Sequence, residues 1–180
     1  MDMKKTLVTA TLLLALASVA HAAKYTTTLT YFNIASVEAF TVTLPGQSAV
    51  TATEGGAATA NIEFNSTDGD DTCIDPCIAA TTTCQDAGTP IFLVENTGTV
   101  PLDLTVYFTS SPPSCIKVGG SSASRAAACT GTIIDTTPVT LANNLAVGNT
   151  ANWWEAANFT GCVAADTTSR TQRVYGVQST

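Results

Sequence analysis

Cysteine is the residue type with the most evident chemistry in this chain. The six cysteines are Cys73, Cys77, Cys84, Cys115, Cys129 and Cys162. An even number of cysteines in an exported chain predicts that all of them pair, here as three disulfide bonds. Cys73 and Cys77 also have the spacing of zinc ligands, but no second pair with matching spacing completes such a site. We therefore expect disulfides, and neither a metal nor another cofactor.

The pairing of these cysteines is only partly suggested by the sequence. Cys115 and Cys129 flank a stretch rich in Gly, Ser and Ala, Gly119 to Ala128, and we expect the two to close this stretch into a local loop. The other four cysteines would then share two bonds. Each bond would add roughly 2–4 kcal/mol to stability, mainly by restricting the unfolded chain.

The single histidine, His21, lies in a segment that resembles a secretory signal peptide. Residues 1–22 combine a positive start, an apolar run and a cleavage site, in the order Lys4-Lys5, Thr6 to Val19 and Ala20-His21-Ala22. Cleavage would leave a chain that starts at Ala23 and contains no imidazole, the commonest general base and metal ligand. Motifs of serine hydrolases and zinc proteases are also absent from the sequence. We therefore expect a protein that is not an enzyme and has no catalytic residues.

Two kinds of ligand or modification site remain as weak candidates. Asp68, Asp70 and Asp71 gather hard oxygen ligands of the kind that calcium prefers. Their spacing is not that of an EF-hand, and an acidic loop of this kind is more often merely solvated. Asn65 and Asn158 each begin an Asn-x-Thr/Ser sequon and are candidate glycosylation sites.

Charge and length limit the class of partner. Removing residues 1–22 takes Asp2, Lys4 and Lys5 from the 14 acidic and 7 basic residues, which leaves 13 acidic against 5 basic residues in 158. A chain this acidic is a poor ligand for nucleic acid or anionic lipid. Its length suits one domain, and no later apolar run approaches the roughly 18 residues of a membrane span. We expect a secreted, extracellular protein with no membrane segment in its mature form.

The composition and periodicity predict β-structure. Threonine accounts for 30 of the 158 residues after position 22, and helix-forming residues are sparse. Apolar residues alternate at Phe40, Val42 and Leu44, and again from Leu102 to Phe108. Further strands are expected at Tyr25 to Ile34, Ala49 to Thr53, Ala57 to Phe64, Ile91 to Glu95, Ile133-Ile134, Val139 to Leu141 and Arg173 to Gln178, with a long loop from Asn65 to Gly88. Short strands joined by Gly and Pro turns favour an antiparallel β-sandwich.

The segment Thr150 to Asn158 is ambiguous at the sequence level. Asn152 and Glu155 could cap a short helix, whereas Trp153 and Trp154 suit a strand with a buried face. We favour the strand. Large aromatic residues in a sandwich are more often core than a sugar-binding platform, and the platform remains the alternative.

One stretch carries a family resemblance. Residues 91–106, IFLVENTGTVPLDLTV, resemble the Asn-x-Gly-x-Val-Pro-Leu-x-Leu stretch of the TasA/camelysin family, and more closely that of the archaeal bundling pilins related to it. The stretch is typical of a strand, a tight turn and a second strand. Asn96 and Gly98 suit the turn, and Pro101 suits the start of the second strand, where no N–H donor is needed.

The resemblance implies a filament subunit with a jelly-roll or Ig-like sandwich. Such subunits polymerise head-to-tail by donor-strand complementation, in which an N-terminal strand of one copy fills a gap in the sheet of the next. Here the donor strand would be residues 23–35, with Tyr25, Thr27, Leu29 and Tyr31 as its donor side chains, and the sandwich domain would be 36–180. The partners would be further copies of the chain along the filament and neighbouring filaments laterally. The expected function is an extracellular bundling pilus or a biofilm-matrix filament.

Two alternative functions are compatible with the sequence. In a type IV-like pilin the apolar segment Thr6 to Ala23 would be retained as a helical filament core. In a monomeric secreted β-sandwich, Trp153 and Trp154 would bind sugars or cell-surface polymers.

Overall fold

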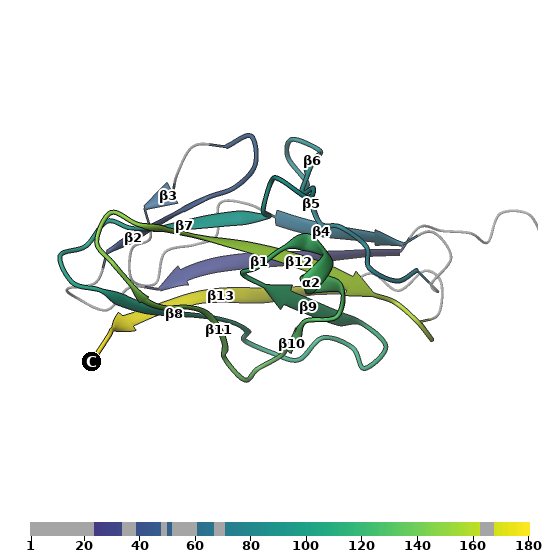
Figure 1. The fold of residues 1–180 in the computed structure, drawn as a ribbon. Helices are drawn as coiled ribbons and strands as arrows, with labels where there is room; N and C mark the ends of the chain where they lie inside the picture. Colours follow the sequence, from purple (N-terminus) through teal and green to yellow (C-terminus); the bar gives the residue numbers. More distant parts are fainter. Residues whose placement is uncertain (1–23, 34–38, 48–49, 52–60, 67–70, 163–167) are drawn as a thin grey trace, which may run out of the picture.

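The chain folds into two β-sheets that enclose one apolar core (Figure 1). The computed structural model describes residues 24–33, 39–47, 50–51, 61–66, 71–162 and 168–180. The expected signal peptide, residues 1–22, lies outside this part of the chain. The prediction of an all-β sandwich is confirmed at this level. The described residues contain no helix with the length and hydropathy that a membrane span requires.

The larger sheet has seven strands in the order β11-β8-β13-β1-β4-β5-β6. Its strands, in chain order, are β1 (Lys24–Asn33), β4 (Asn61–Ser66), β5 (Cys77–Ile78), β6 (Thr83–Cys84), β8 (Leu102–Phe108), β11 (Val139–Leu145) and β13 (Thr168–Gln178). Neighbours are antiparallel except for β1 and β13, which run parallel.

The smaller sheet has six strands in the order β10-β9-β12-β7-β2-β3. These strands are β2 (Phe40–Thr43), β3 (Val50–Thr51), β7 (Phe92–Asn96), β9 (Lys117–Ser121), β10 (Thr132–Ile134) and β12 (Thr150–Asn158). The short helix α2 (Arg125–Cys129) packs on β9 and β12, where Ala128 contacts Trp154 and Ala156 in a small apolar cluster of its own. The helix therefore covers part of the outer face of the smaller sheet.

Alternating side chains of both sheets build the core. In β8 the residues Leu102, Leu104, Val106 and Phe108 are buried and the residues between them are only partly so, as their alternation predicts. The segment Thr150 to Asn158, which the sequence left open between helix and strand, is strand β12. Its two tryptophans, Trp153 and Trp154, are 1% and 6% exposed. Both are buried, as predicted, but in different places: Trp153 belongs to the core between the sheets, and Trp154 to the small outer cluster under α2. They form no exposed aromatic platform.

Two stretches expected to be loops contain regular structure. Within Asn65 to Gly88, strands β5 and β6 form a small hairpin that extends the larger sheet. The Gly/Ser/Ala-rich stretch Gly119 to Ala128 is not a loop throughout, because Gly119 and Gly120 lie inside β9 and residues 125–128 begin α2. The small residues are required by packing. A Cβ atom on Gly120 would lie 2.3 Å from the Trp153 ring, and one on Gly119 would lie 2.2 Å from the carbonyl oxygen of Ala128.

This close packing gives a first prediction. Gly120→Ala should lower the free energy of unfolding by about 1–3 kcal/mol, because the added methyl group displaces the Trp153 ring in a filled core. Gly88→Ala is the matched control, since its Cβ would meet only Asp86 Oδ1, at 3.6 Å. Urea unfolding followed by tryptophan fluorescence measures both variants. Equal midpoints for the two variants would contradict the packing described for Gly120.

Candidate functional site: the first strand of the larger sheet

Strand β1 occupies the centre of the larger sheet (Figure 1). It pairs in parallel with β13, from Thr26 opposite Thr168 to Asn33 opposite Tyr175. On its other side it pairs antiparallel with β4, from Lys24 opposite Ser66 to Leu29 opposite Asn61. In the sheet that the structure describes, β1 is the sole link between the strands β11-β8-β13 and the strands β4-β5-β6.

The strands beside β1 carry buried residues. Ile62 and Phe64 of β4 and Val174 of β13 are 0% exposed and belong to the main core cluster. Without β1, both strands would present an edge of unpaired N–H and C=O groups beside an opened core. The position between β13 and β4 therefore has to be filled by a strand.

The expected donor segment, residues 23–35, contains this strand, but the single chain uses it in its own sheet. The predicted donor side chains, those of Tyr25, Thr27, Leu29 and Tyr31, lie outside the part of the chain whose side chains are described. The register of β1 along β13 is continuous to Asn33, whereas its pairing with β4 stops at Leu29.

The register also shows which positions of β1 lie opposite buried residues. Thr26 pairs with Phe64 and Thr28 with Ile62. On the other side, Phe32 pairs with Val174. Directly opposed residues of adjacent strands share a face of the sheet. In the single chain, the even-numbered positions therefore match the core face of the neighbouring strands.

A buried carboxyl group connects the two sheets next to β1. Glu155 of β12 is 0% exposed, and its Oε1 accepts a hydrogen bond from Nε1 of Trp153 at 2.9 Å. The same oxygen accepts from Nε2 of Gln172, a buried residue of β13 whose register partner in β1 is Thr30. Burial raises the pKa of Glu155 to about 7, against the smaller opposing effect of these two donors.

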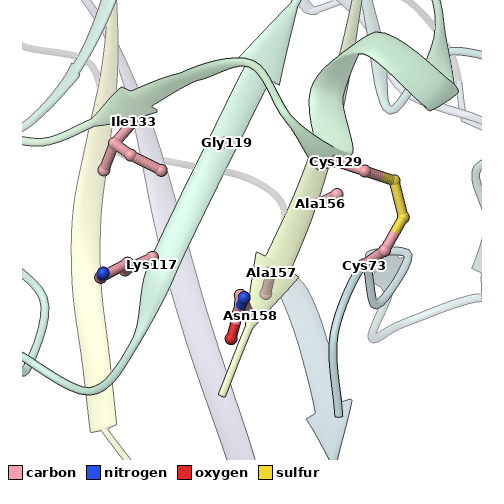
Figure 2. A pocket seen from close by; sticks show the side chains of 8 residues that line it. All are labelled: Cys73, Lys117, Gly119, Cys129, Ile133, Ala156, Ala157 and Asn158. Carbon is pink, nitrogen blue, oxygen red and sulfur yellow. A yellow bond between two sulfur atoms is a disulfide. The ribbon is translucent and has the colours of Figure 1, made fainter. Parts of the chain in front are cut away.

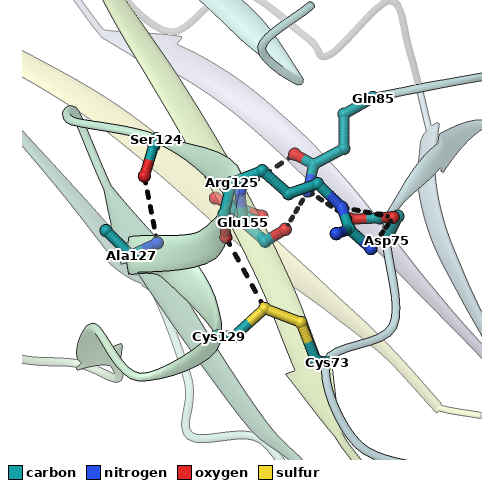
Figure 3. The surroundings of a disulfide bond; sticks show 8 residues. All are labelled: Cys73, Asp75, Gln85, Ser124, Arg125, Ala127, Cys129 and Glu155. Carbon is teal, nitrogen blue, oxygen red and sulfur yellow. Dashed lines mark hydrogen bonds and ion pairs between the residues drawn. A yellow bond between two sulfur atoms is a disulfide. The ribbon is translucent and has the colours of Figure 1, made fainter. Parts of the chain in front are cut away.

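Gln85 continues the hydrogen bonding of β12 where its neighbouring strand ends. Pairing of β12 with β7 stops at Trp153, and two residues later the N–H of Glu155 donates to Oε1 of Gln85 at 3.0 Å. Nε2 of Gln85 in turn donates to the carbonyl oxygen of Glu155 (Figure 3). The side-chain amide thus satisfies both backbone groups, as a residue of a neighbouring strand would.

An ion pair and a disulfide hold the segment from Cys73 to Gln85 in place beside β12. Nε2 of Gln85 also donates to Asp75 at 2.9 Å, and Nε of Arg125 donates to both carboxylate oxygens of Asp75 at 2.7 Å. The Asp75 carboxylate raises the pKa of the Arg125 guanidinium. Figure 3 shows this chain of contacts beside the disulfide Cys73–Cys129, which joins the same segment to α2.

All six cysteines form disulfides, so the predicted three bonds are confirmed, but the predicted pairing was wrong. The bonds are Cys73–Cys129, Cys77–Cys84 and Cys115–Cys162. Cys129 ends α2 above β12, and Cys73 reaches the same place because the next residue, Ile74, pairs with Ala157 of β12. Cys115 precedes β9 and Cys162 follows β12, and the adjacent ends of these two strands bring them together. Such bonds indicate an oxidising compartment.

The turn of the family-like stretch is centred on Asn96. This residue is 0% exposed, and its side-chain amide donates to the carbonyl oxygens of Val100, at 2.9 Å, and Leu145, at 2.8 Å. Its Oδ1 accepts from the N–H of Gly98 at 3.0 Å. One side chain thus closes the turn and attaches it to the end of β11. Pro101 is exposed and directly precedes β8.

The weaker candidate sites receive little support. Asp68 and Asp70 lie outside the described residues, and Asp71 accepts a hydrogen bond from Ser66 at 2.9 Å. No group of three potential metal ligands occurs among the described residues. Asn65 is exposed near the end of β4, whereas Asn158 is half-buried and its Oδ1 accepts from the N–H of Thr160 at 2.9 Å.

A small pocket lies between β9, β12 and the disulfide Cys73–Cys129 (Figure 2). Its volume is about 60 Å³, well below the roughly 300–1,000 Å³ of a typical small-molecule site. Its lining contains no carboxylate, hydroxyl or imidazole group, and consists of Cys73, Lys117, Gly119, Cys129, Ile133, Ala156, Ala157 and Asn158. This pocket offers no pair of acid and base.

No protein-family model and no curated protein matches the chain. The function has to be inferred from the structure itself, and the position of β1 in the larger sheet is its most informative feature.

Asn96 gives a second prediction. Asn96→Ala should lower the free energy of unfolding by about 2–3 kcal/mol, because the buried carbonyl group of Leu145 loses its donor and the turn loses its closing contact. Asn143→Ala, at an exposed position of β11, is the control. Thermal or urea unfolding measures the difference. A loss no larger than that of the control would show that Asn96 does not hold the turn.

Proposed function

We propose that this chain is the structural subunit of an extracellular bundling pilus or biofilm-matrix filament with a jelly-roll-like sandwich. In this proposal, β1 leaves its own sheet and fills the same position in the next copy. The observation that carries the proposal is that an N-terminal strand occupies the centre of a sheet that would otherwise be divided in two.

The place of β1 in the chain supports the exchange. β1 is the first described strand, so it can leave the sheet without breaking the connection between any two later strands. Exchange of the strand between copies keeps one strand in the position between β13 and β4, so the backbone pairing lost in one copy is regained in the next and the exchange costs little free energy. A donor strand and a receiving position on different parts of the surface produce a head-to-tail contact. Such a contact does not close, and it generates an open fibre.

The strength of the pairing is sufficient for a durable filament. β1 is paired on both sides, with β13 along Thr26 to Asn33 and with β4 along Lys24 to Leu29. On the order of ten backbone hydrogen bonds at about 1 kcal/mol each would contribute about 10 kcal/mol. This is comparable to the stability of a whole domain, about 5–15 kcal/mol.

The apolar residues of β1 between Tyr25 and Tyr31 do not match the register of the single chain, although Phe32 does. In the single chain, the large apolar residues Tyr25, Leu29 and Tyr31 are in register with the polar residues Asn65, Asn61 and Arg173. A shift of one residue exchanges the two faces of a strand and would bring these apolar residues opposite buried ones. We infer that the strand adopts this shifted register in the filament, where Tyr25, Leu29 and Tyr31 act as donor side chains.

One observation favours a different function, a monomeric secreted β-sandwich. β1 completes the sheet of its own chain, as a monomer requires. The sugar-binding form of that alternative is weakened because Trp153 and Trp154 are buried. The type IV-like alternative depends on residues 6–23, and the mass of the mature N-terminus distinguishes it from cleavage before Ala23.

The third prediction separates filament and monomer. The chain from Ala23 should form threads in negative-stain micrographs that resist dilution, whereas a chain from residue 34 should form none, because the position between β13 and β4 stays empty. A synthetic peptide of residues 23–33 should bind the truncated chain and raise its melting temperature without restoring threads.

Two controls accompany this experiment. Removal of Ser179 and Thr180, which follow β13, should leave assembly intact, and a peptide with the same residues in scrambled order should not bind. Threads from the truncated chain, or a full chain that stays monomeric at every concentration in size-exclusion chromatography, would overturn the proposal.

A further inference from the structure

Two buried oxygen atoms in the link between the sheets have no hydrogen-bond partner among the described residues. They are Oε2 of Glu155 and Oε1 of Gln172. The remaining polar atoms of these two side chains are bonded to each other, since Nε2 of Gln172 donates to Oε1 of Glu155. An ionised carboxylate and an amide oxygen are both acceptors, so neither can satisfy the other. Each unsatisfied buried group carries a desolvation cost.

One proton on the carboxyl group would give both oxygen atoms a hydrogen-bond partner. A neutral carboxylic acid and a primary amide can form a ring of two hydrogen bonds, in which the amide N–H donates to one carboxyl oxygen and the acid O–H donates to the amide oxygen. The first of these bonds is present between Gln172 and Glu155. We propose that Glu155 binds one structural proton on Oε2 and donates it to Oε1 of Gln172, which joins the two sheets by a closed acid–amide pair.

The surroundings of Glu155 favour a neutral group. On the core side, its neighbours are the indole of Trp153 and the amide of Gln172. Its register partner in β9 is Gly120, which has no side chain. The hydrogen bonds continue through Gln85 to Asp75 and Arg125, whose charges compensate each other in an ion pair.

Three further charged residues that the structure describes near Glu155 make no contact with its carboxyl group. In β13, Arg170 donates to Ser111 O and to Thr168 Oγ1, and Arg173 alternates with the buried residues Gln172 and Val174. Asp86, next to Gln85, is exposed and accepts from the N–H groups of Gly88 and Thr89. Among the residues whose side chains the structure describes, an ionised Glu155 would have no paired cation, and a buried unpaired charge is strongly unfavourable.

The direction of the pH dependence follows from this burial. The pKa of Glu155 is raised from 4.5 to about 7 in the folded chain. Below pH 4.5 both the folded and the unfolded chain hold the proton, and the full stabilisation is present. Between pH 4.5 and about 7 only the folded chain holds it, so stability falls as the pH rises, and above about 7 the contribution is lost. The unfolding equilibrium constant should change on the order of 100-fold across this window.

If the chain forms filaments as proposed above, the acid–amide pair of Glu155 and Gln172 should also affect their stability. Gln172 is in β13, and its register partner in β1 is Thr30. The proton therefore fixes the strand that receives β1 to the opposite sheet, and filaments should release subunits faster as the pH rises through 7. The pH dependence of the stability of a single chain does not require filaments. The structural proton and the filament can therefore be disproved separately.

The fourth prediction uses Glu155→Gln, which replaces the acid O–H with a permanent N–H donor of nearly the same shape. In urea unfolding, the free energy of unfolding of the wild-type mature chain should fall relative to that of this variant between pH 4.5 and 7.5. All other titrating groups are the same in both chains, so the difference between the two reports on Glu155 alone. Glu95→Gln, at a half-buried position of β7, is the matched control and should keep the wild-type pH profile. A difference between wild type and Glu155→Gln that is constant with pH would overturn the proposal.

A direct titration keeps the proposal testable even where the variant fails to fold. The carboxyl carbon of Glu155 in ¹³C-labelled wild-type chain should titrate near pH 7, together with the fluorescence of Trp153, whose indole N–H contacts the same carboxyl group. An ordinary titration near pH 4.5 would show that the pair holds no proton at neutral pH and would overturn the proposal.

Discussion

The pairing of β1 with β13 on one side and β4 on the other is the interaction on which the larger sheet depends. These two ladders join three strands of the sheet to the other three, and they cover core residues such as Phe64 and Val174. An interior strand contributes to stability through both of its edges, whereas an edge strand contributes through one. Here this interior strand is also the first strand that the structure describes.

The rest of the sandwich is fastened in ways that do not involve β1. The disulfide Cys115–Cys162 ties the strands β9 and β12, and Cys73–Cys129 ties α2 to the segment that supports Glu155. Gln85 replaces a missing strand neighbour for β12. The contact between Glu155 and Gln172 joins the sheets directly beside the position of β1. These contacts hold the rest of the sandwich together independently of β1, as the proposed exchange of that strand requires.

The sequence predicted the features that local patterns determine. The alternation from Leu102 to Phe108 predicted strand β8, and the segment 150–158 is strand β12 with both tryptophans buried. Features that depend on distant residues were missed. The bond Cys73–Cys129 joins residues 56 apart, and Gln85 meets Glu155 across 70 residues. A lone Gln and a lone Glu in a sequence carry no periodic signal, so only the folded chain brings them together. A glutamate at a core-facing position of β12 was the one available clue.

We propose that, in the filament, the strand between β13 and β4 comes from another copy of the chain. A density map of the assembled protein tests it most directly, because the connection from Asn33 to Ala39 shows to which subunit each β1 belongs. We predict a continuous trace from that strand into the sandwich of the adjacent subunit, with Leu29 opposite a buried residue of β4. A trace that returns to the same subunit, in the register of the single chain, would contradict the account.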